Sequence, residues 1–304
     1  MYYMVNDRHG ARDRYRFQHA KLMVFDSRVV YISSENFSPE SMPDDNKRNG
    51  TWGRRGVGLL TDAIGVVARA QALMAADLDP VHHADIFAWN AADPVYGPPP
   101  DGYTPPVPQD GTLYQVLFTT PLTLYGTFPF EVVQSPETSL RADAGLLPMV
   151  ARADAGDTVL VEQLYEHHHW GPLNSTPTDY PNPRLEAYVA AARRGARVRV
   201  LLDYYFDDPS DPRSNAITVA YLNGLARQEG LDLEARRGNP TYLGLHNKMV
   251  LVEADGRGWV HVGSLNGSEI AAKVNRELAL QVQSNEVYQY LAEMFWKDWE
   301  KSRP

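Results

Sequence analysis

Apolar residues recur with helical spacing and with short strand-like runs, in alternation, through the second half of the chain. The helical spacing predicts three helices, over 139–155, 184–194 and 215–229. Short runs rich in β-branched residues predict three strands, over 158–165, 197–203 and 231–236. Strands that alternate with helices form a largely buried parallel or mixed sheet, so the expected fold class is α/β.

Part of this pattern occurs twice. A strand-like run followed by an amphipathic helix is predicted at 55–59 with 63–78, and again at 276–280 with 285–301. At the same spacing other residues coincide: Arg55 with Arg276, Val66 with Val287, and Asp77 with Asp298. The second copy has a longer turn-rich hairpin around 254–258, and the first has a longer segment at 37–54. A long unit present twice predicts two pseudo-symmetric lobes.

The copies differ in what precedes them. The α/β series described above leads into the second copy, whereas only a short segment precedes the first. We therefore expect a first lobe that lacks its opening α/β units. Clustered prolines between the copies predict an extended linker, part of which covers the cleft. The expected domains are 1–79, the C-terminal part of a first lobe; 80–127, the linker; and 128–304, a complete second lobe.

Composition limits the class of protein. The 304 residues, 43% of them apolar, are enough for two lobes with cores of their own. The absence of cysteine excludes disulfides and thiolate chemistry. A net charge of −9 disfavours non-specific binding to duplex nucleic acid. No apolar run is long enough to span a bilayer. The compartment stays open between cytoplasm, membrane periphery and export, because the N-terminus is expected to be incomplete.

Two His-x-Lys pairs carry the candidate chemistry. They are His19 with Lys21 and His246 with Lys248, and in a strand residues i and i+2 face the same side. Each pair is followed by a carboxylate and then by a Ser-x-Asn: Asp26, Ser34 and Asn36 in the first copy, and Glu253, Ser264 and Asn266 in the second. Two matching sets predict one active site built from both lobes.

These residues resemble the HKD motif of the phospholipase D superfamily. The first copy departs from the motif at Ser33, where glycine is usual, and the second at Glu253, where aspartate is usual. Asp255 is a weaker match for the missing acid, because it lies in the hairpin turn. The resemblance implies two phospholipase D-like lobes, an active site at their interface, and phosphodiester cleavage or transfer without a metal or other cofactor.

The resemblance also implies roles. One histidine attacks phosphorus to form a phosphohistidine, and the other protonates the leaving oxygen; family precedent favours His19 as the nucleophile. The two lysines and the Ser-x-Asn residues would bind the phosphate oxygens. Glu277 is expected to hydrogen-bond His246 and fix its tautomer. Its counterpart in the first copy is Gly56, so the two histidines are not equivalent.

Several interpretations stay open at the level of sequence. The favoured substrate is a phospholipid, with peripheral membrane contact. A nuclease acting on nucleic acid is the alternative, which Glu253 favours, and a degenerate member that binds phosphodiesters without turnover is the third. His167, His168 and His169 suggest either a metal site or a cleft lining. The stripe Tyr288, Leu291, Phe295 and Trp299 has helical spacing and fits either a core or a membrane-docking face.

Overall fold

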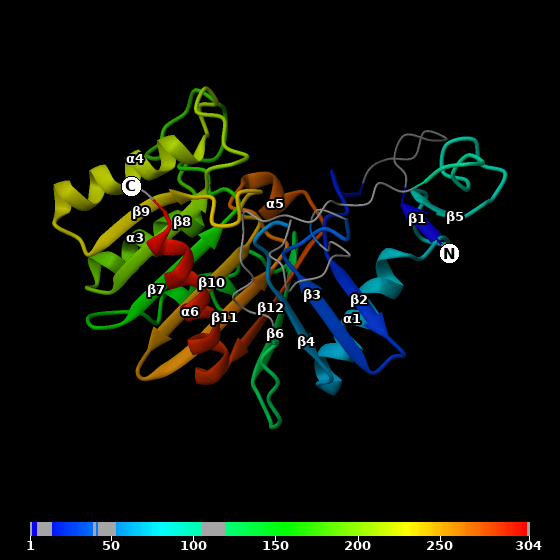
Figure 1. The fold of residues 1–304 in the computed structure, drawn as a ribbon, viewed down its shortest axis with the longest axis horizontal. Coiled ribbons are helices and arrows are strands. Elements are labelled where there is room, and N and C mark those ends of the chain that lie inside the picture. Colours follow the sequence, from blue (N-terminus) through cyan, green and yellow to red (C-terminus); the bar gives the residue numbers. More distant parts are fainter. Residues whose placement is uncertain (1, 5–13, 39–40, 42–52, 105–119, 303–304) are drawn as a thin grey trace.

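The computed structural model describes residues 2–4, 14–38, 41, 53–104 and 120–302. Its largest element is a seven-stranded mixed sheet in the second lobe, with the order β6-β12-β11-β10-β7-β8-β9 (Figure 1). The strands are β6 (Phe130–Ser135), β7 (Thr158–Gln163), β8 (Arg197–Asp203), β9 (Leu233–Gly238), β10 (Lys248–Ala254), β11 (Arg257–Gly263) and β12 (Glu277–Gln283). β7, β8 and β9 are parallel and the other pairs are antiparallel, which confirms the α/β class.

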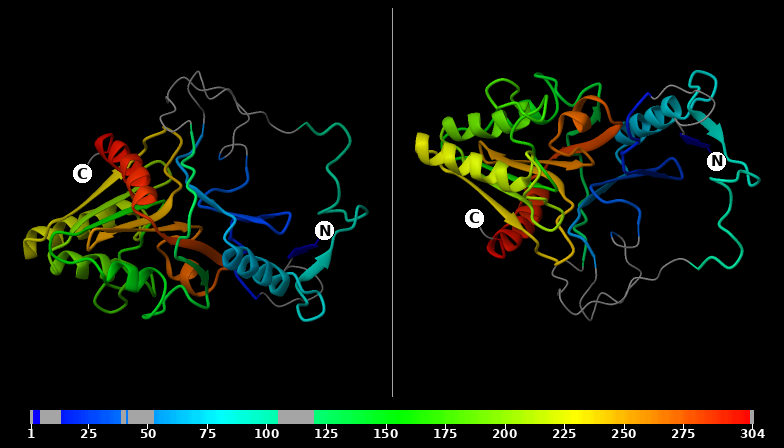
Figure 2. Two further views of the ribbon diagram at one scale, coloured as in Figure 1. Left: turned by 90° about the horizontal axis from the view of Figure 1, so that it is seen from below. Right: turned by 90° about the horizontal axis from the view of Figure 1, so that it is seen from above.

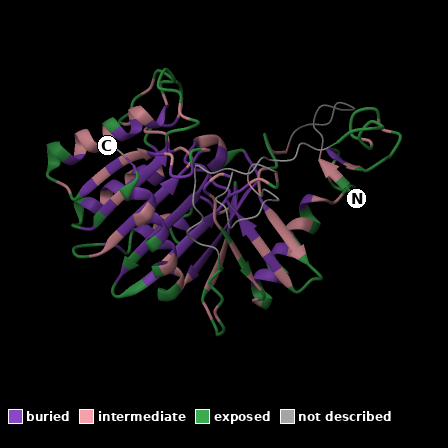
Figure 3. Ribbon diagram, viewed as in Figure 1, coloured by how far each residue is buried: buried purple, intermediate pink, exposed green. Residues whose placement is uncertain are grey.

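Helices cover both faces of this sheet. α2 (Leu146–Val150), α3 (Pro183–Arg193) and α4 (Asn215–Glu229) pack on one face, and α6 (Asn285–Glu300) packs on the other (Figure 2). The central strands are buried on both sides (Figure 3) and contain apolar runs such as 249–252 of β10, whereas the edge strand β9 is charged at three of its six positions. The stripe Tyr288, Leu291, Phe295 and Trp299 lies in this core, on the sheet side of α6. Its alternative interpretation as a membrane-docking face is therefore wrong.

Capping residues mark the ends of the two long helices α3 and α4. The side chain of Ser214 accepts a hydrogen bond from the backbone N–H of Ile217 at the start of α4. The same helix ends at Gly230, whose φ of 70° is the left-handed conformation that glycine adopts without strain. Asn182 caps α3 in the same way, directly before Pro183. These local signals explain why the two long helices of the α/β series match their predicted ranges closely.

The first lobe repeats only the C-terminal part of the second. It contains β2 (Leu22–Phe25), β3 (Val29–Ser33) and β4 (Gly58–Thr61), followed by α1 (Ile64–Asp77). These correspond to β10, β11, β12 and α6. Leu22 pairs with Ile32 in the first hairpin, and its counterpart Met249 pairs with Val262 in the second. More residues therefore separate the paired positions in the second hairpin, as the sequence repeat predicts. In the part of the chain that the structure describes, the first lobe has no counterpart of β7, β8, β9, α3 or α4.

Three segments differ from the sequence-based prediction. The helix expected over 139–155 is reduced to α2, because Gly145 has a φ of 82° and Pro148 lacks a backbone N–H. A short α5 (Glu269–Lys273) and the edge strand β6 were not predicted. The linker, expected to be loop-like, contributes β5 (Ile86–Ala88), which pairs with β1 (Tyr2–Met4). Part of the linker was expected to cover the cleft, and its residues 105–119 lie outside the described residues.

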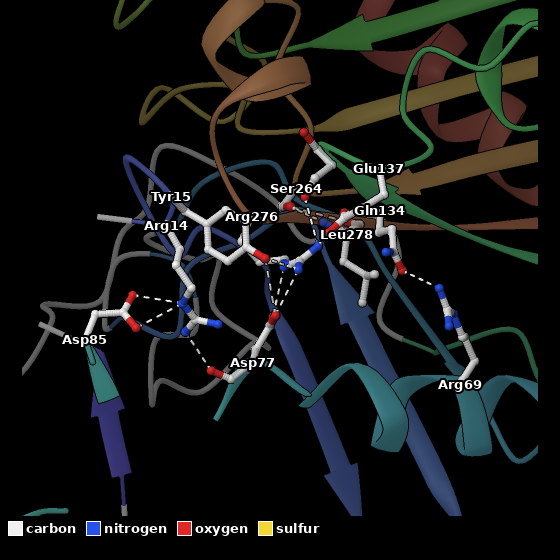
Figure 4. A network of polar contacts seen from close by, with 11 residues as sticks. Arg14, Tyr15, Arg69, Asp77, Asp85, Gln134, Glu137, Ser264, Arg276 and Leu278 are labelled. Carbon is white, nitrogen blue, oxygen red and sulfur yellow. Dashed lines mark hydrogen bonds and ion pairs between the residues drawn. The ribbon is translucent and has the colours of Figure 1, made fainter. Parts of the chain in front are cut away.

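Reciprocal ion pairs join the two lobes. Arg55 of the first lobe contacts Asp298 of α6 through Nε at 2.6 Å and Nη2 at 3.1 Å. Arg276 of the second lobe contacts Asp77 of α1 through Nε and Nη2, both at 2.8 Å (Figure 4). These are the arginines and aspartates that coincide in the sequence repeat. Each arginine therefore binds the terminal helix of the other lobe with a bidentate, buried contact.

Removing one partner of such a pair leaves an uncompensated buried charge. We expect Arg55→Ala to lower the free energy of unfolding by about 3–5 kcal/mol, measured by urea denaturation. The matched control is Arg141→Ala, which removes an exposed arginine paired with Asp143 at 2.6 Å and should leave the midpoint unchanged. Equal effects of the two substitutions would show that the lobe-joining pair is not stabilising.

Candidate active site

Both His-x-Lys segments lie at the lobe interface, and each is paired with the other lobe. Gln18 forms a parallel bridge with Arg276, and Arg55 forms one with Leu245. In consequence the backbone N–H of His19 donates to the carbonyl of Arg276 at 2.9 Å. The N–H of His246 likewise donates to the carbonyl of Arg55 at 2.8 Å. The arginines that join the lobes thus also fix the backbone of both histidines.

Glu277 is the partner of His19. Its Oε2 lies 2.7 Å from His19 Nδ1, and its Oε1 accepts from Asn275 Nδ2 at 2.9 Å. Glu277 is fully buried, so this charged contact is strong and favours a proton on Nδ1. Nε2 of His19 is then left with a free lone pair. The expectation that Glu277 serves His246 of its own lobe is wrong, because β12 begins at the interface and its first side chain reaches the other lobe.

His246 has two competing neighbours. Its Nδ1 lies 3.1 Å from Lys248 Nζ and 3.4 Å from Glu35 Oε2. Burial and Lys248 lower the pKa of His246 to about 4, and Glu35 opposes them. Glu35 is the site residue that sequence reasoning missed. One feature of the sequence could have indicated Glu35. Gly56 stands where the other copy has Glu277, so one of the two histidines needed a carboxylate from elsewhere in the chain.

The two lysines are buried cations. Lys21 Nζ donates to the carbonyl of His19 at 2.8 Å, and Lys248 Nζ donates to that of His246 at 2.7 Å. Burial lowers the pKa of Lys21 to about 8 and that of Lys248 to about 7, although Glu277 and Glu35 act in the opposite direction. An anion bound between the lysines would restore their charge, so the site is suited to a phosphate or similar group.

The two serines of the Ser-x-Asn pairs bind the protein's own backbone. Ser34 Oγ accepts from the N–H of Val57 at 3.0 Å, and Ser264 Oγ accepts from the N–H of Leu278 at 3.0 Å. Ser264 Oγ also donates to the carbonyl of Leu278, and Ser34 Oγ to Asn247 Oδ1. Both hydroxyl groups hold the start of the next strand, β12 or its counterpart β4. The expectation that they donate to a phosphate is therefore not supported.

The two asparagines keep their predicted role as candidates. Asn266 is buried, and its Oδ1 has no hydrogen-bond partner among the described residues. Asn36 is partly buried. An amide presents a donor and an acceptor, so either residue can bind a phosphate oxygen or an alcohol.

A cavity of about 410 Å³ opens beside His246. Both charged and aromatic residues line it: Arg54, Asp207, Asp208, Asp211 and Arg213, with Tyr165, His167 and Phe206. Of the three consecutive histidines, His167 lines the cavity, whereas His169 Nδ1 contacts the carbonyl of Trp170 at 2.7 Å. Among the described residues no three His, Asp or Glu side chains are grouped as a metal site.

Comparison with known proteins agrees with this geometry. A family profile described as the PLD-like domain of cardiolipin synthase matches residues 176–299, most of the second lobe. This part of the chain is therefore similar to a phospholipase D-like domain. A phosphatidylserine synthase from Haemophilus influenzae Rd KW20 has the same fold, with a TM-score of 0.56 and 12% identity over 94% of this chain and 62% of that chain.

Two further solved structures match little more than half of this chain. Nuc from Salmonella typhimurium, described as a phospholipase D family member, gives a TM-score of 0.43 at 21% identity, over 58% of this chain and 97% of its own. NucT from Helicobacter pylori gives 0.43 at 18% identity, over 58% of this chain and 98% of its own. No curated protein sequence matches the chain. No helix in the described part of the chain is long and apolar enough to cross a membrane.

The acidic residues of the superfamily motif, Asp26 and Glu253, do not reach the site. Asp26 is exposed in the turn between β2 and β3, with a φ of 48° that aspartate tolerates in tight turns. Glu253 is exposed near the end of β10, opposite Gly258. Each carboxylate follows the lysine of its own motif by five positions, which is a rise of about 16 Å along an extended chain. Because side chains alternate between the two faces of a strand, an odd separation places the carboxylate on the face opposite the lysine. The expectation that they are catalytic is therefore corrected.

The lowered pKa values of Lys21 and Lys248 predict how the affinity of this site for a simple anion depends on pH. Sulfate keeps its charge between pH 6 and 9, so its affinity should fall as the free protein loses protons from Lys248 (about 7) and Lys21 (about 8). Linkage sets the slope at up to about tenfold per pH unit for each proton taken up on binding. Isothermal titration calorimetry measures it.

The matched substitutions are Lys248→Met, which should remove the part of the slope near pH 7, and Lys273→Met at an exposed lysine, which should change nothing. A sulfate affinity that is constant from pH 6 to 9 in the unmodified protein would contradict the assignment of the two lysines as the anion site.

Proposed function

We propose that this chain hydrolyses or transfers the phosphatidyl group of a phospholipid through a phosphohistidine on His19. The observation that carries the proposal is the meeting of two His–Lys pairs at the lobe interface, each histidine with a carboxylate at its Nδ1. Phosphodiester cleavage needs a nucleophile, an acid for a poor leaving group, and cations around the phosphate oxygens. The described residues supply all three.

The geometry supports different roles for the two histidines. Glu277 accepts from Nδ1 of His19, so Nε2 holds the lone pair that attacks phosphorus and forms a P–N bond. The P–O bond to the leaving group breaks, and His246 gives that oxygen a proton from Nε2. His246 then takes a proton from water or from an acceptor alcohol, whose oxygen attacks phosphorus and releases His19. The net change is hydrolysis or exchange of the alcohol.

The lysines provide the charge that the anionic phosphate requires. Lys21 and Lys248 are almost fully buried, and in a water-poor site their attraction for the equatorial oxygens is little screened. The negative charge of the bound diester also favours the protonated form of His246, against the effect of burial. Binding of the substrate thus prepares the acid that its leaving group needs.

The cavity favours a small polar leaving group over a nucleic-acid strand. Its lining has three carboxylates, from Asp207, Asp208 and Asp211, and two guanidinium groups, from Arg54 and Arg213, so the negative charges outnumber the positive ones. A polyanionic strand would be repelled there, whereas a hydroxyl- or amine-bearing head group would find hydrogen-bond acceptors.

Exposed aromatic side chains close to this cavity support a lipid substrate. Tyr204, Tyr205 and Phe206 follow β8 directly and are about half exposed, and Phe206 lines the cavity. Tyrosine has an apolar ring with a polar end, which suits the boundary between lipid and water. The family profile and the phosphatidylserine synthase described above support the same substrate class. We infer peripheral contact with a membrane surface.

Trapping of the covalent intermediate tests the proposal. The protein is mixed briefly with lipid that has a labelled phosphatidyl group or, in a parallel sample, with labelled oligonucleotide. Each reaction is then quenched in alkali, because phosphoramidates are labile in acid. The unmodified chain should carry label from lipid alone, and His19→Ala should carry none. His246→Ala should accumulate label from a phosphatidyl nitrophenol ester, since that leaving group needs no proton whereas hydrolysis of the intermediate needs the base.

The other interpretations predict different results. Label from oligonucleotide and none from lipid would make the chain a nuclease. Binding of lipid without label or turnover would make it a degenerate member. Label that survives in His19→Ala and disappears in His246→Ala would reverse the two roles.

A further inference from the structure

The two histidines receive carboxylates from positions that do not correspond in the repeat. In the second lobe the residue after Arg276 is Glu277, which contacts His19. In the first lobe the residue after Arg55 is Gly56, which has no side chain to offer. His246 nevertheless faces a carboxylate, from Glu35, which lies between Ser34 and Asn36.

Glu35 occupies the volume that a side chain at position 56 would fill. A Cβ atom added to Gly56 would overlap the Cγ, Cδ and Oε1 atoms of Glu35. The absence of a side chain at position 56 is therefore what allows Glu35 to reach His246. The counterpart of Glu35 in the second lobe is Leu265, which packs in an apolar group with Val133 and Ala279. The first lobe thus has its carboxylate at the position that corresponds to Leu265, and no side chain at the position that corresponds to Glu277.

The surroundings of Glu35 explain its charge. Both carboxylate oxygens are buried and accept no hydrogen bond of standard geometry from the described residues. Their ion pair is with His246, whose Nδ1 lies 3.4 Å from Oε2. Burial raises the pKa of Glu35, but contacts with His246, Ser41 and Lys248 outweigh burial and hold the pKa below its usual range. A buried carboxylate is costly unless it is paired. Its pairing with an imidazole that gains and loses a proton fits a role in proton transfer.

We infer that Glu35 is the positioning residue of His246, and that Gly56 is required for this role. The inference rests on the proposed function only for the acid–base role of His246. Glu35 accepts a hydrogen bond from Nδ1–H and so keeps Nε2 as the atom that gives and takes the proton. Lys248 competes for Nδ1 as a donor, and without Glu35 it would hold His246 with its proton on Nε2, unable to act as a base.

A set of four variants tests this relocation kinetically. Glu35→Gln keeps the shape and removes the charge; Glu35→Leu introduces the second-lobe residue; Gly56→Glu adds the missing carboxylate; and the fourth combines the last two. We expect Glu35→Gln to slow cleavage of a lipid with an alkyl leaving group by about 10²–10³-fold. Formation of the intermediate from the nitrophenol ester should slow by less than tenfold, since its leaving group needs no acid.

The combined variant separates relocation from loss of a side chain. Gly56→Glu alone should reduce activity and stability, because Glu35 fills its space. Glu35→Leu combined with Gly56→Glu should be at least tenfold more active than Glu35→Leu. The matched control is Glu293→Gln, at an exposed glutamate of α6. Unchanged rates in Glu35→Gln, or equal losses with both leaving groups, would overturn the inference.

A measurement without turnover keeps the test independent of the proposed function and of the folding of the combined variant. ¹⁵N NMR of histidine-labelled protein at neutral pH reports the tautomer of each imidazole. Glu35→Leu, which removes the hydrogen-bond acceptor, should move the proton of His246 from Nδ1 to Nε2 and leave His19 unchanged. No change at His246 would overturn the inference even if the enzyme is active. A tautomer change in a protein with no phosphodiesterase activity would support Glu35 and refute the proposed reaction.

Discussion

The bidentate contacts of Arg55 with Asp298 and of Arg276 with Asp77 are the constraint on which the site depends. Each arginine anchors the terminal helix of the other lobe, and its own carbonyl group binds the N–H of the other lobe's histidine. Packing of the lobes and placement of the reacting groups are therefore the same event. Separation of the lobes would break these ion pairs together with the backbone hydrogen bonds beside them, and would part each histidine from its carboxylate on the other lobe.

Within this nearly symmetric frame the two histidines have different electrostatic environments. His19 has one close carboxylate at 2.7 Å, which fixes one tautomer. His246 lies between an ammonium group and a carboxylate, so each of its protonation states has a partner. In the reaction proposed above, this difference would assign the roles of nucleophile and of acid–base to two residues of the same type. The fold itself hosts many reactions, so this local asymmetry carries more information about function than the architecture does.

The candidate site was partly predictable from sequence. The convergence of four residues was predicted, because the spacing of the motif and its repetition can be detected in the chain itself. These residues are His19, Lys21, His246 and Lys248. Asp26 and Glu253 belong to the same motif, yet strand geometry carries them away from the site to exposed positions. Ser34 and Ser264 are held by backbone groups of the following strand segments, which a motif does not reveal. The motif therefore identifies a set of residues, but it does not show which of them face the site and which hold the surrounding structure.

The sequence by itself determined the α/β class, the long helices and strands of the second lobe, and the repeat that relates the lobes. Periodicity, capping residues such as Ser214, and turn residues act over a few positions, so they can be detected in a linear chain. The tertiary structure decided which carboxylate meets which histidine. That choice depends on strand ends that meet across the interface and on space left by Gly56 for Glu35. Both are contacts between segments distant in sequence, which local patterns do not encode.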